Sequence, residues 1–150
     1  MIDPIEIEVD LRKEMTEIIR HCFEVHNTLR GGMLEPVYQE CLAIEFTDAK
    51  MPFEREKLLR LIYKGRKLEK EYRADFVCYN SIVVELKAVE ELRSEHRMQL
   101  YHYLRMTQLP IGLLVNFGLD SLEFEKYGYD TETNNVFLLS RYPSREDKER

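Results

Sequence analysis

The sequence predicts a single α/β domain over residues 1–150, in which helices flank a mixed β-sheet. Three observations indicate this fold class. The 150 residues, 44% of them hydrophobic, are enough to form one buried core. Hydrophobic residues recur every three or four positions in the first third of the chain, and the pattern then becomes extended. No internal repeat or linker interrupts the chain, so the expected order is α-α-β-β-β-α-β with short C-terminal strands.

Two helices are predicted before the sheet. Residues 10–29 place hydrophobic side chains at steps of three and four, which is typical of an amphipathic helix. The glycines at 31 and 32 end this helix. A second helical pattern covers residues 34–46, with Pro36 in its first turn, where a missing N–H has no consequence. Glu35 is therefore expected at a helix start.

Extended segments follow Pro52. Residues 58–63, 72–79 and 82–88 each predict a strand, and residues 64–66, Lys-Gly-Arg, predict the turn between the first two. Because these segments follow one another closely, we expect an antiparallel meander.

The second half of the chain predicts one more helix and further strands. The helix begins at Ser94 and ends before Pro110, because proline disfavours helix in the residue that precedes it. Residues 111–117 are mostly apolar and predict a strand covered on both faces. Residues 122–124 and 136–139 predict two short strands, which are separated by an acidic, turn-rich stretch.

Composition excludes several classes of protein. The net charge of −6 argues against binding nucleic acid by bulk attraction. Cys22, Cys41 and Cys78 have no Cys-x-x-Cys pair and no histidine at ligand spacing, so we predict reduced core thiols rather than zinc ligands. No signal peptide or membrane span is found, so a soluble, cytoplasmic protein is expected. The charged residues from Pro143 onwards are predicted to fray.

One segment opposes the overall charge. Residues 55–73 contain eight basic and three acidic residues, which gives this stretch a net charge of +5. Two interpretations are open. The segment is either a solvated hairpin or a surface that contacts phosphates.

The main candidate site is Asp75, Glu85 and Lys87. Residues two apart on a strand share a face, so Glu85 and Lys87 point to the same side. Asp75 lies on the preceding strand and meets Glu85 only if an odd-numbered loop near Asn80, or a bulge, sets the register. Paired in this way, the two carboxylates would lie within bridging distance of a common ion.

Two adjacent carboxylates repel each other unless a cation separates them, so this pattern points to a divalent metal. Oxygen ligands from Asp75, Glu85 and the main-chain carbonyl of Leu86 suit Mg²⁺ or Mn²⁺ better than zinc. Lys87 would then hold the attacking water and offset charge on a phosphate. The alternative is an exposed edge-strand ion network in which Lys87 simply pairs with Glu85.

Several separated motifs accompany this trio. They are Gly32-Met-Leu-Glu35-Pro-Val-Tyr38, Tyr72-Arg-Ala-Asp75, Val84-Glu85-Leu-Lys87-Ala88, the helical residues His96, Gln99 and Tyr103, and Val115-Asn116-Phe117-Gly118. In this order, from about residue 18 to residue 118, the chain resembles the GxxExxY family of the PD-(D/E)XK nuclease superfamily. We expect the last motif to be structural, with Gly118 permitting a turn that other residues resist.

The resemblance implies a restriction-endonuclease-like fold and a catalytic centre. By this resemblance Asp75, Glu85 and Lys87 form the acidic and lysine centre, and Glu35 is an acid supplied by the helix before the sheet, in the metal shell directly or through water. Ala74 replaces the proline of the superfamily's Pro-Asp, which removes no ligand. The implied cofactor is Mg²⁺ or Mn²⁺, and the implied partner is nucleic acid.

Further side chains are predicted to support this centre. Gln99 matches a helical position that often hydrogen-bonds to the active centre in the superfamily. His96, Gln99 and Tyr103 follow a spacing of three and four, so one helix face would carry them together. Tyr38 lies three residues after Glu35 and would present a phenol beside the acid. His96 taken alone is also explained as a satisfied surface histidine.

Three functions remain open at this point. The first is a Mg²⁺-dependent phosphodiesterase that acts on DNA or RNA. The second is a noncatalytic binding or complex-forming module that keeps the fold, and the third is a hydrolase of another phosphate ester. The apolar face of the first helix also makes a homodimer an expectation.

Overall fold

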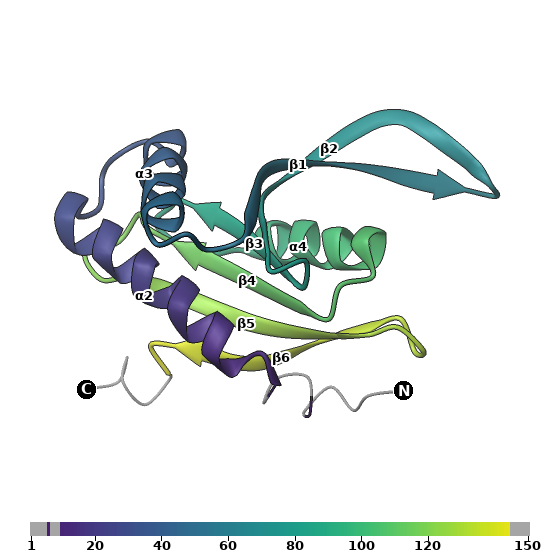
Figure 1. Ribbon diagram of the computed structural model, residues 1–150. Coiled ribbons are helices and arrows are strands. Elements are labelled where there is room, and N and C mark those ends of the chain that lie inside the picture. Colours follow the sequence, from purple (N-terminus) through teal and green to yellow (C-terminus); the bar gives the residue numbers. More distant parts are fainter. Residues whose placement is uncertain (1–5, 7–9, 145–150) are drawn as a thin grey trace.

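The computed structural model describes residue 6 and residues 10–144, so most of the predicted frayed tail lies outside the described residues. Two helices precede three strands, and a third helix precedes three more strands (Figure 1). In chain order these elements are α2 (Arg12–Leu29), α3 (Glu35–Asp48), β1 (Phe53–Tyr63), β2 (Arg66–Cys78), β3 (Ile82–Lys87), α4 (Ser94–Thr107), β4 (Ile111–Asn116), β5 (Glu123–Asp130) and β6 (Asn135–Tyr142). The predicted element order is confirmed.

In the described chain the strands form one six-stranded sheet in the order β1-β2-β3-β4-β5-β6. The β3–β4 pair is parallel, with α4 as the crossover, and the other pairs are antiparallel. The sheet is therefore mixed, as predicted. The meander expected for the first three strands is confirmed.

Hydrophobic residues form a core on each face of the sheet. Helices α2 and α3 cover one face, where Met15, Tyr38 and Phe46 pack against residues such as Val84 and Leu113. Helix α4 covers the other face (Figure 1). Strand β4 lies between these layers and is buried along its whole length, so the prediction of a strand covered on both faces is confirmed.

The apolar face of α2, from which a homodimer is predicted, is buried within the chain itself. Met15, Ile18, Cys22 and Val25 are at most 3% exposed and belong to the core between α2 and the sheet. This face therefore gives no support to self-association. None of the helices in the described chain is both long and apolar enough to cross a membrane.

The three cysteines are free thiols, as predicted. Cys22 and Cys78 are buried, and Cys41 is partly buried. Burial raises the pKa of the Cys22 and Cys78 thiols, so they stay protonated in the core.

The β1–β2 hairpin is longer than the sequence pattern indicates. Pairing begins at Phe53 and continues outward to Tyr63, opposite Arg66, whereas the prediction began at residue 58 on β1 and at residue 72 on β2. Lys64 and Gly65 form the turn with φ values of 48° and 76°, the left-handed conformation that two-residue hairpins use. The additional residues, 53–57 on β1 and 66–71 on β2, are mostly charged and exposed, so they show no apolar strand pattern.

The last two strands are also longer than predicted, eight residues each. They contain polar residues, Glu123 and Glu125 among them, that do not fit an apolar strand pattern. Both carboxylates accept hydrogen bonds from other polar side chains. Because they are paired in this way, they fit into the sheet without interrupting it.

Candidate active site

The loop between β2 and β3 sets the register that the site requires. Cys78 pairs with Ile82, which leaves the three residues 79–81 as the loop. Tyr79 and Asn80 adopt φ values of 55° and 53°, and the Ser81 N–H donates to the Cys78 carbonyl at 3.1 Å. The predicted odd-numbered loop is therefore confirmed.

Asp75 and Glu85 meet where strands β2 and β3 separate. Backbone pairing between these strands ends at Phe76 and Val84, so the next position in register places Asp75 opposite Glu85. The Asp75 N–H donates to Glu85 Oε1 at 2.8 Å, and the Leu86 N–H donates to Asp75 Oδ2 at 2.8 Å. The two carboxylates thus replace the missing strand-to-strand hydrogen bonds.

Helix α3 supplies a residue that the sequence reasoning missed. Gln39 is 6% exposed, and its Nε2 donates to Asp75 Oδ1 at 2.7 Å. Its Oε1 accepts a hydrogen bond from Arg55 Nε at 2.9 Å. The available signal is its position four residues after Glu35, which places both side chains on one helix face.

Burial raises the pKa values of the three carboxyl groups, and the charge of Asp75 adds to this effect at Glu85 and Glu35. Glu85 is 3% exposed, and burial followed by the charge of Asp75 raises its pKa well above the ordinary value. Burial also raises the pKa of Asp75, despite the hydrogen bonds from Leu86 and Gln39. The pKa of Glu35 is raised by burial and by Asp75. Strongly perturbed acids that share a partly buried site are typical of functional centres.

Lys87 is the cation of this group. It is half-buried, and its charge lowers the pKa values of Glu35, Asp75 and Glu85, against the larger effect of burial. Strand β3 is an interior strand between β2 and β4, and Lys87 takes part in none of the ion pairs found among residues 10–144. The alternative of an exposed edge-strand ion pair is therefore wrong.

Helix α4 brings its row of polar residues over the site. Burial and the nearby charge of Glu85 raise the pKa of Tyr103 to about 12. Gln99 Nε2 donates to the Tyr103 hydroxyl at 3.1 Å, so Gln99 contacts the phenol. Burial and then Lys87 lower the pKa of His96, whose Nδ1 accepts the Arg93 N–H at 2.9 Å. Tyr103 therefore lies at the carboxylate end of the site, and His96 lies at the end near Lys87.

Tyr38 occupies a different position from the one predicted. Its ring is fully buried and stacks on Phe117 with centroids 4.8 Å apart. Its hydroxyl donates to the Arg30 carbonyl at 2.6 Å and accepts the Met33 N–H at 3.1 Å. Gly32 lies inside this loop with a φ of 102°, which favours glycine. Tyr38 therefore holds the loop that positions the start of α3, and its phenol is not presented beside Glu35.

The Asn116-Phe117-Gly118 motif fixes the loop that follows β3. Asn116 is fully buried; its Oδ1 accepts the Val89 N–H and its Nδ2 donates to the Val89 carbonyl, both at 3.0 Å. A Cβ at Gly118 would lie 2.4 Å from the Val89 nitrogen. The structural role is as expected, but its cause is this close backbone approach; the positive-φ glycines are Gly32 and Gly65.

The donor atoms of the site fit a hard divalent cation. Within the described residues, no three Asp, Glu, His or Cys side chains form a ready-made metal-binding cluster. Asp75 and Glu85 nevertheless offer carboxylate oxygens, and each oxygen has a second lone pair beyond the one used by an N–H. The Leu86 carbonyl points to the same side as its N–H, towards Asp75. An all-oxygen donor set of this kind suits Mg²⁺ or Mn²⁺.

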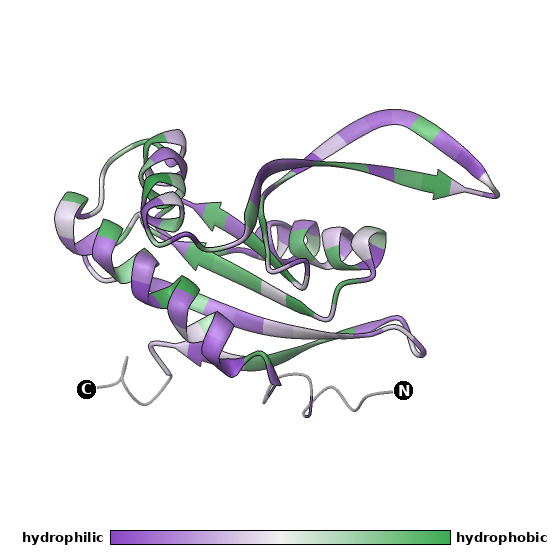
Figure 2. Cartoon of the chain, viewed as in Figure 1, coloured by the Kyte–Doolittle hydropathy of each residue, from purple (hydrophilic) through white to green (hydrophobic). Residues whose placement is uncertain are grey.

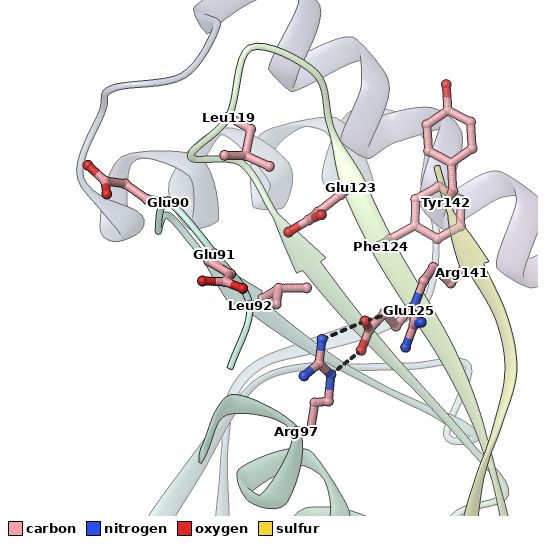
Figure 3. Close-up of a pocket in the computed structure, with 10 residues that line it drawn as sticks. All are labelled: Glu90, Glu91, Leu92, Arg97, Leu119, Glu123, Phe124, Glu125, Arg141 and Tyr142. Carbon is pink, nitrogen blue, oxygen red and sulfur yellow. Dashed lines mark hydrogen bonds and ion pairs between the residues drawn. The ribbon is translucent and has the colours of Figure 1, made fainter. Parts of the chain in front are cut away.

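A separate pocket of about 280 Å³ lies between the loop after β3, α4 and strands β5 and β6 (Figure 3). Its buried carboxylate, Glu125, accepts hydrogen bonds from Arg97 at 2.8 and 3.0 Å, from Arg141 at 3.3 Å and from Tyr127 at 2.5 Å. Burial raises the pKa of Glu125, but the hydrogen bonds from Arg97 and Tyr127 outweigh it and leave the pKa lowered. Glu125 is thus held by arginines from α4 and β6, so we interpret this contact as a structural clamp of α4 and β6 on β5.

The model of one protein family, described as the PD-(D/E)XK nuclease superfamily, matches residues 12–127. The chain belongs to the PD-(D/E)XK nuclease superfamily. The matched region extends from α2 to β5 and includes the whole candidate site. The restriction-endonuclease-like fold predicted from the sequence is confirmed for this PD-(D/E)XK domain.

Among solved structures, this PD-(D/E)XK domain is similar to the crystal structure of SSO0001, with a TM-score of 0.50 and 23% sequence identity. The similarity covers 67% of this chain and 54% of that one, so the chain spans about half the length of that relative. At this identity the comparison shows the fold alone. No curated protein matches the chain.

Proposed function

We propose that the protein is a divalent-metal-dependent nuclease of the GxxExxY type, which hydrolyses phosphodiester bonds in DNA or RNA. One observation carries the proposal: where β2 and β3 separate, the carboxylates of Asp75 and Glu85 are each held by a backbone N–H of the other strand, and Lys87 is near enough to act on their charge. The superfamily membership supports nuclease chemistry at this place. The three free cysteines fit a reducing, cytoplasmic compartment.

Asp75, Glu85 and the Leu86 carbonyl would hold Mg²⁺ or Mn²⁺, and Glu35 would join them directly or through water. When bound, the ion would lower the pKa of a coordinated water and neutralise charge on the phosphate. Gln39 orients Asp75 through the bond from its Nε2 to Oδ1, and the Leu86 N–H holds the other oxygen. The carboxylate is thereby fixed before any ion arrives, which is the arrangement that preorganised sites require.

Lys87 is proposed to orient the attacking water and to stabilise negative charge that develops on the phosphate. Its ammonium group already acts on all three carboxyl groups, so it lies close to the reacting centre. A cation placed where charge develops stabilises the transition state more than the substrate. Tyr103 stays protonated at neutral pH, so it offers a hydroxyl donor beside Glu85, with Gln99 bound to it.

Cleavage of single-stranded and duplex DNA and RNA tests this proposal. The wild type should cleave at least one of these substrates when Mg²⁺ or Mn²⁺ is added. Glu85→Ala and Lys87→Ala should each lower the rate by about 100-fold or more, since each removes a group that acts on the developing charge. Glu40→Gln, an exposed acid on α3, is the matched control and should retain wild-type activity. Activity that survives both site substitutions would refute the proposal.

The second candidate function is a noncatalytic nuclease-fold module that binds nucleic acid or joins a complex. It is favoured by the observation that the described side chains form no ready-made metal cluster. This function predicts no cleavage of any of the four substrates with either ion. The same assay therefore separates the two candidates. Cleavage of a small phosphate ester alone would instead indicate a hydrolase of another substrate.

A further inference from the structure

The β1–β2 hairpin projects beyond the body of the domain as an arm (Figure 1). We define the arm as residues 55–73, which carry a net charge of +5 within a chain of −6, so the rest of the chain carries −11. Every residue from 61 to 70 is exposed. The β2 side of the arm is mostly hydrophilic, whereas distal β1 is hydrophobic, with Leu61, Ile62 and Tyr63 exposed (Figure 2). Positive charge is therefore concentrated on the segment that reaches furthest from an acidic body.

The two faces of the arm differ in charge. Leu59 and Tyr72 pair across the strands and face α4, where the Tyr72 ring meets the edge of Tyr103 with centroids 6.3 Å apart. The Lys70 ammonium lies 5.7 Å from the Tyr72 ring centroid, so Lys70 lies on this face. Farther out the pairing shifts register between Arg60 and Ile62, and Arg66 then pairs with Tyr63. Glu71, between Lys70 and Tyr72 in the sequence, points to the opposite face.

On the opposite face, Glu71 pairs with two arginines. Glu71 accepts a hydrogen bond from Arg60 at 2.6 Å and lies 3.9 Å from Arg73. By contrast, the ion pairs of residues 10–144 include none of the four basic residues nearest the turn, which are Lys64, Arg66, Lys67 and Lys70.

Two tyrosine rings lie beside these cations. Tyr63 pairs with Arg66 across the hairpin and is 59% exposed. Lys64 lies 5.5 Å from the Tyr63 ring centroid, and Lys70 lies 5.7 Å from that of Tyr72. Cations that contact phosphates, together with exposed rings on which bases stack, are the features of surfaces that bind single-stranded nucleic acid.

The arm is continuous with the candidate active site. Strand β2 carries both Asp75 and Arg66, and nine residues of strand extend about 30 Å at most. The face that carries Tyr72 reaches Tyr103, and Tyr103 lies beside Glu85. A polyanion lying along this face would therefore lead directly into the site.

From this arrangement we infer that the arm binds a single strand of nucleic acid through Lys64, Arg66, Lys70 and Tyr63, and guides it to Asp75 and Glu85. The inference rests on the proposed nuclease function, and it assigns to the arm the substrate binding that the acidic body disfavours.

Fluorescence anisotropy with labelled oligonucleotides of about 20 residues tests this inference, because a strand of that length spans the site size of typical single-strand binders. The full-length chain is titrated in EDTA, which prevents metal-dependent cleavage. Lys64, Arg66 and Lys70 are changed together to Gln. The matched control changes Arg12, Lys13 and Arg20 of α2 to Gln; these residues are exposed and the charge loss is the same.

The arm variant should bind single strands at least about tenfold more weakly, and its slope of log affinity against log salt should fall by about 2, or about 0.7 per lost phosphate contact. The α2 variant should bind as the wild type does. Tyr63→Ala should weaken single-strand binding about fivefold or more and Tyr63→Phe should restore it, because only the ring is needed for stacking. Duplex should bind less tightly than single strands.

Several results would overturn the inference. One is that the arm and α2 variants weaken oligonucleotide binding equally, which would show that binding depends on total charge and not on the arm. Others are tighter binding of duplex than of single strands, or no binding of any oligonucleotide. A change of sedimentation mass in the arm variant without a change in binding would assign the arm to a second copy of the chain. Arm-dependent binding without cleavage would defeat the proposed nuclease function alone, and cleavage with unaltered binding by the arm variant would defeat this inference alone.

Discussion

Glu85 is a carboxyl group held almost completely out of water, beside a second carboxyl group. Burial and Asp75 raise its folded pKa above the ordinary value of 4.5. An acid of this kind stabilises the fold while it is protonated. That stability is fully present below the unfolded pKa and is lost as the pH rises through the folded pKa. In the absence of metal, the contribution of Glu85 to the free energy of unfolding should therefore fall as the pH rises above about 4.5.

Glu85→Gln should make the metal-free protein more stable at about pH 8, by about 1 kcal/mol or more, since one unit of pKa corresponds to about 1.4 kcal/mol. The amide is neutral at every pH, and its oxygen still accepts the Asp75 N–H. Denaturant unfolding in EDTA at about pH 4 and about pH 8 measures the effect, with Glu40→Gln as control. A Glu85→Gln protein that is less stable than the wild type at the higher pH would contradict the account.

At the residue scale, the sequence predicts the position of a site residue where that position depends only on spacing along one helix or strand. Glu85 and Lys87 share a strand face, and Glu35 begins a helix, so local periodicity places all three. Gln39 could not be predicted in this way because its contact with Asp75 depends on how α3 packs against β2. Tyr38 was placed beside Glu35 by helical spacing, but its hydroxyl reaches the loop before the helix. Spacing gives a helix face and does not give the direction of a long side chain.

At the scale of elements, the loop after β3 depends on one close backbone contact. A methyl group at Gly118 would lie 2.4 Å from the nitrogen and 2.5 Å from the oxygen of Val89. Backbone atoms yield less easily than the end of a side chain, so both segments would have to move. Since this loop directly follows Lys87, the displacement would also reach the candidate site.

Gly118→Ala should lower the free energy of unfolding by about 2 kcal/mol or more, as overpacked sites do. Gly65→Ala is the control: it has a φ of 76° and meets no atom within 4 Å, so it should cost only about 1 kcal/mol of backbone strain. Denaturant unfolding compares the two variants. Equal effects would show that the approach to Val89 is not what requires glycine at this position.

The order of elements and the β2–β3 register could be predicted because each has a local cause. Helices and strands have different periods, and a loop with an odd number of residues brings residues 75 and 85 opposite each other. The full length of the β1–β2 hairpin could not be predicted, because residues 53–57 on β1 and 66–71 on β2 are mostly charged and exposed and show no apolar strand pattern. The lengths of β5 and β6 depend on partners such as Arg97, which contacts Glu125 from a distant part of the chain.

At the scale of the whole molecule, the fold places two regions of opposite charge next to each other. The body is acidic and contains the carboxylates, whereas the arm is basic and begins at the strand that carries Asp75. A metal ion requires negative groups around it, whereas a polyanion requires positive ones. The acidic body and the basic arm provide both in one domain. The proposed function therefore depends first on whether the carboxylates bind an ion.

Titration of the full-length protein with Mn²⁺, followed by electron paramagnetic resonance at about pH 8, tests this claim most directly, because the carboxylates must be ionised to bind. Mn²⁺ should bind the wild type and Glu40→Gln with the same affinity. Asp75→Asn and Glu85→Gln should each weaken binding about tenfold or more. Mn²⁺ binding that is absent from the wild type, or unchanged by both site substitutions, would contradict the account.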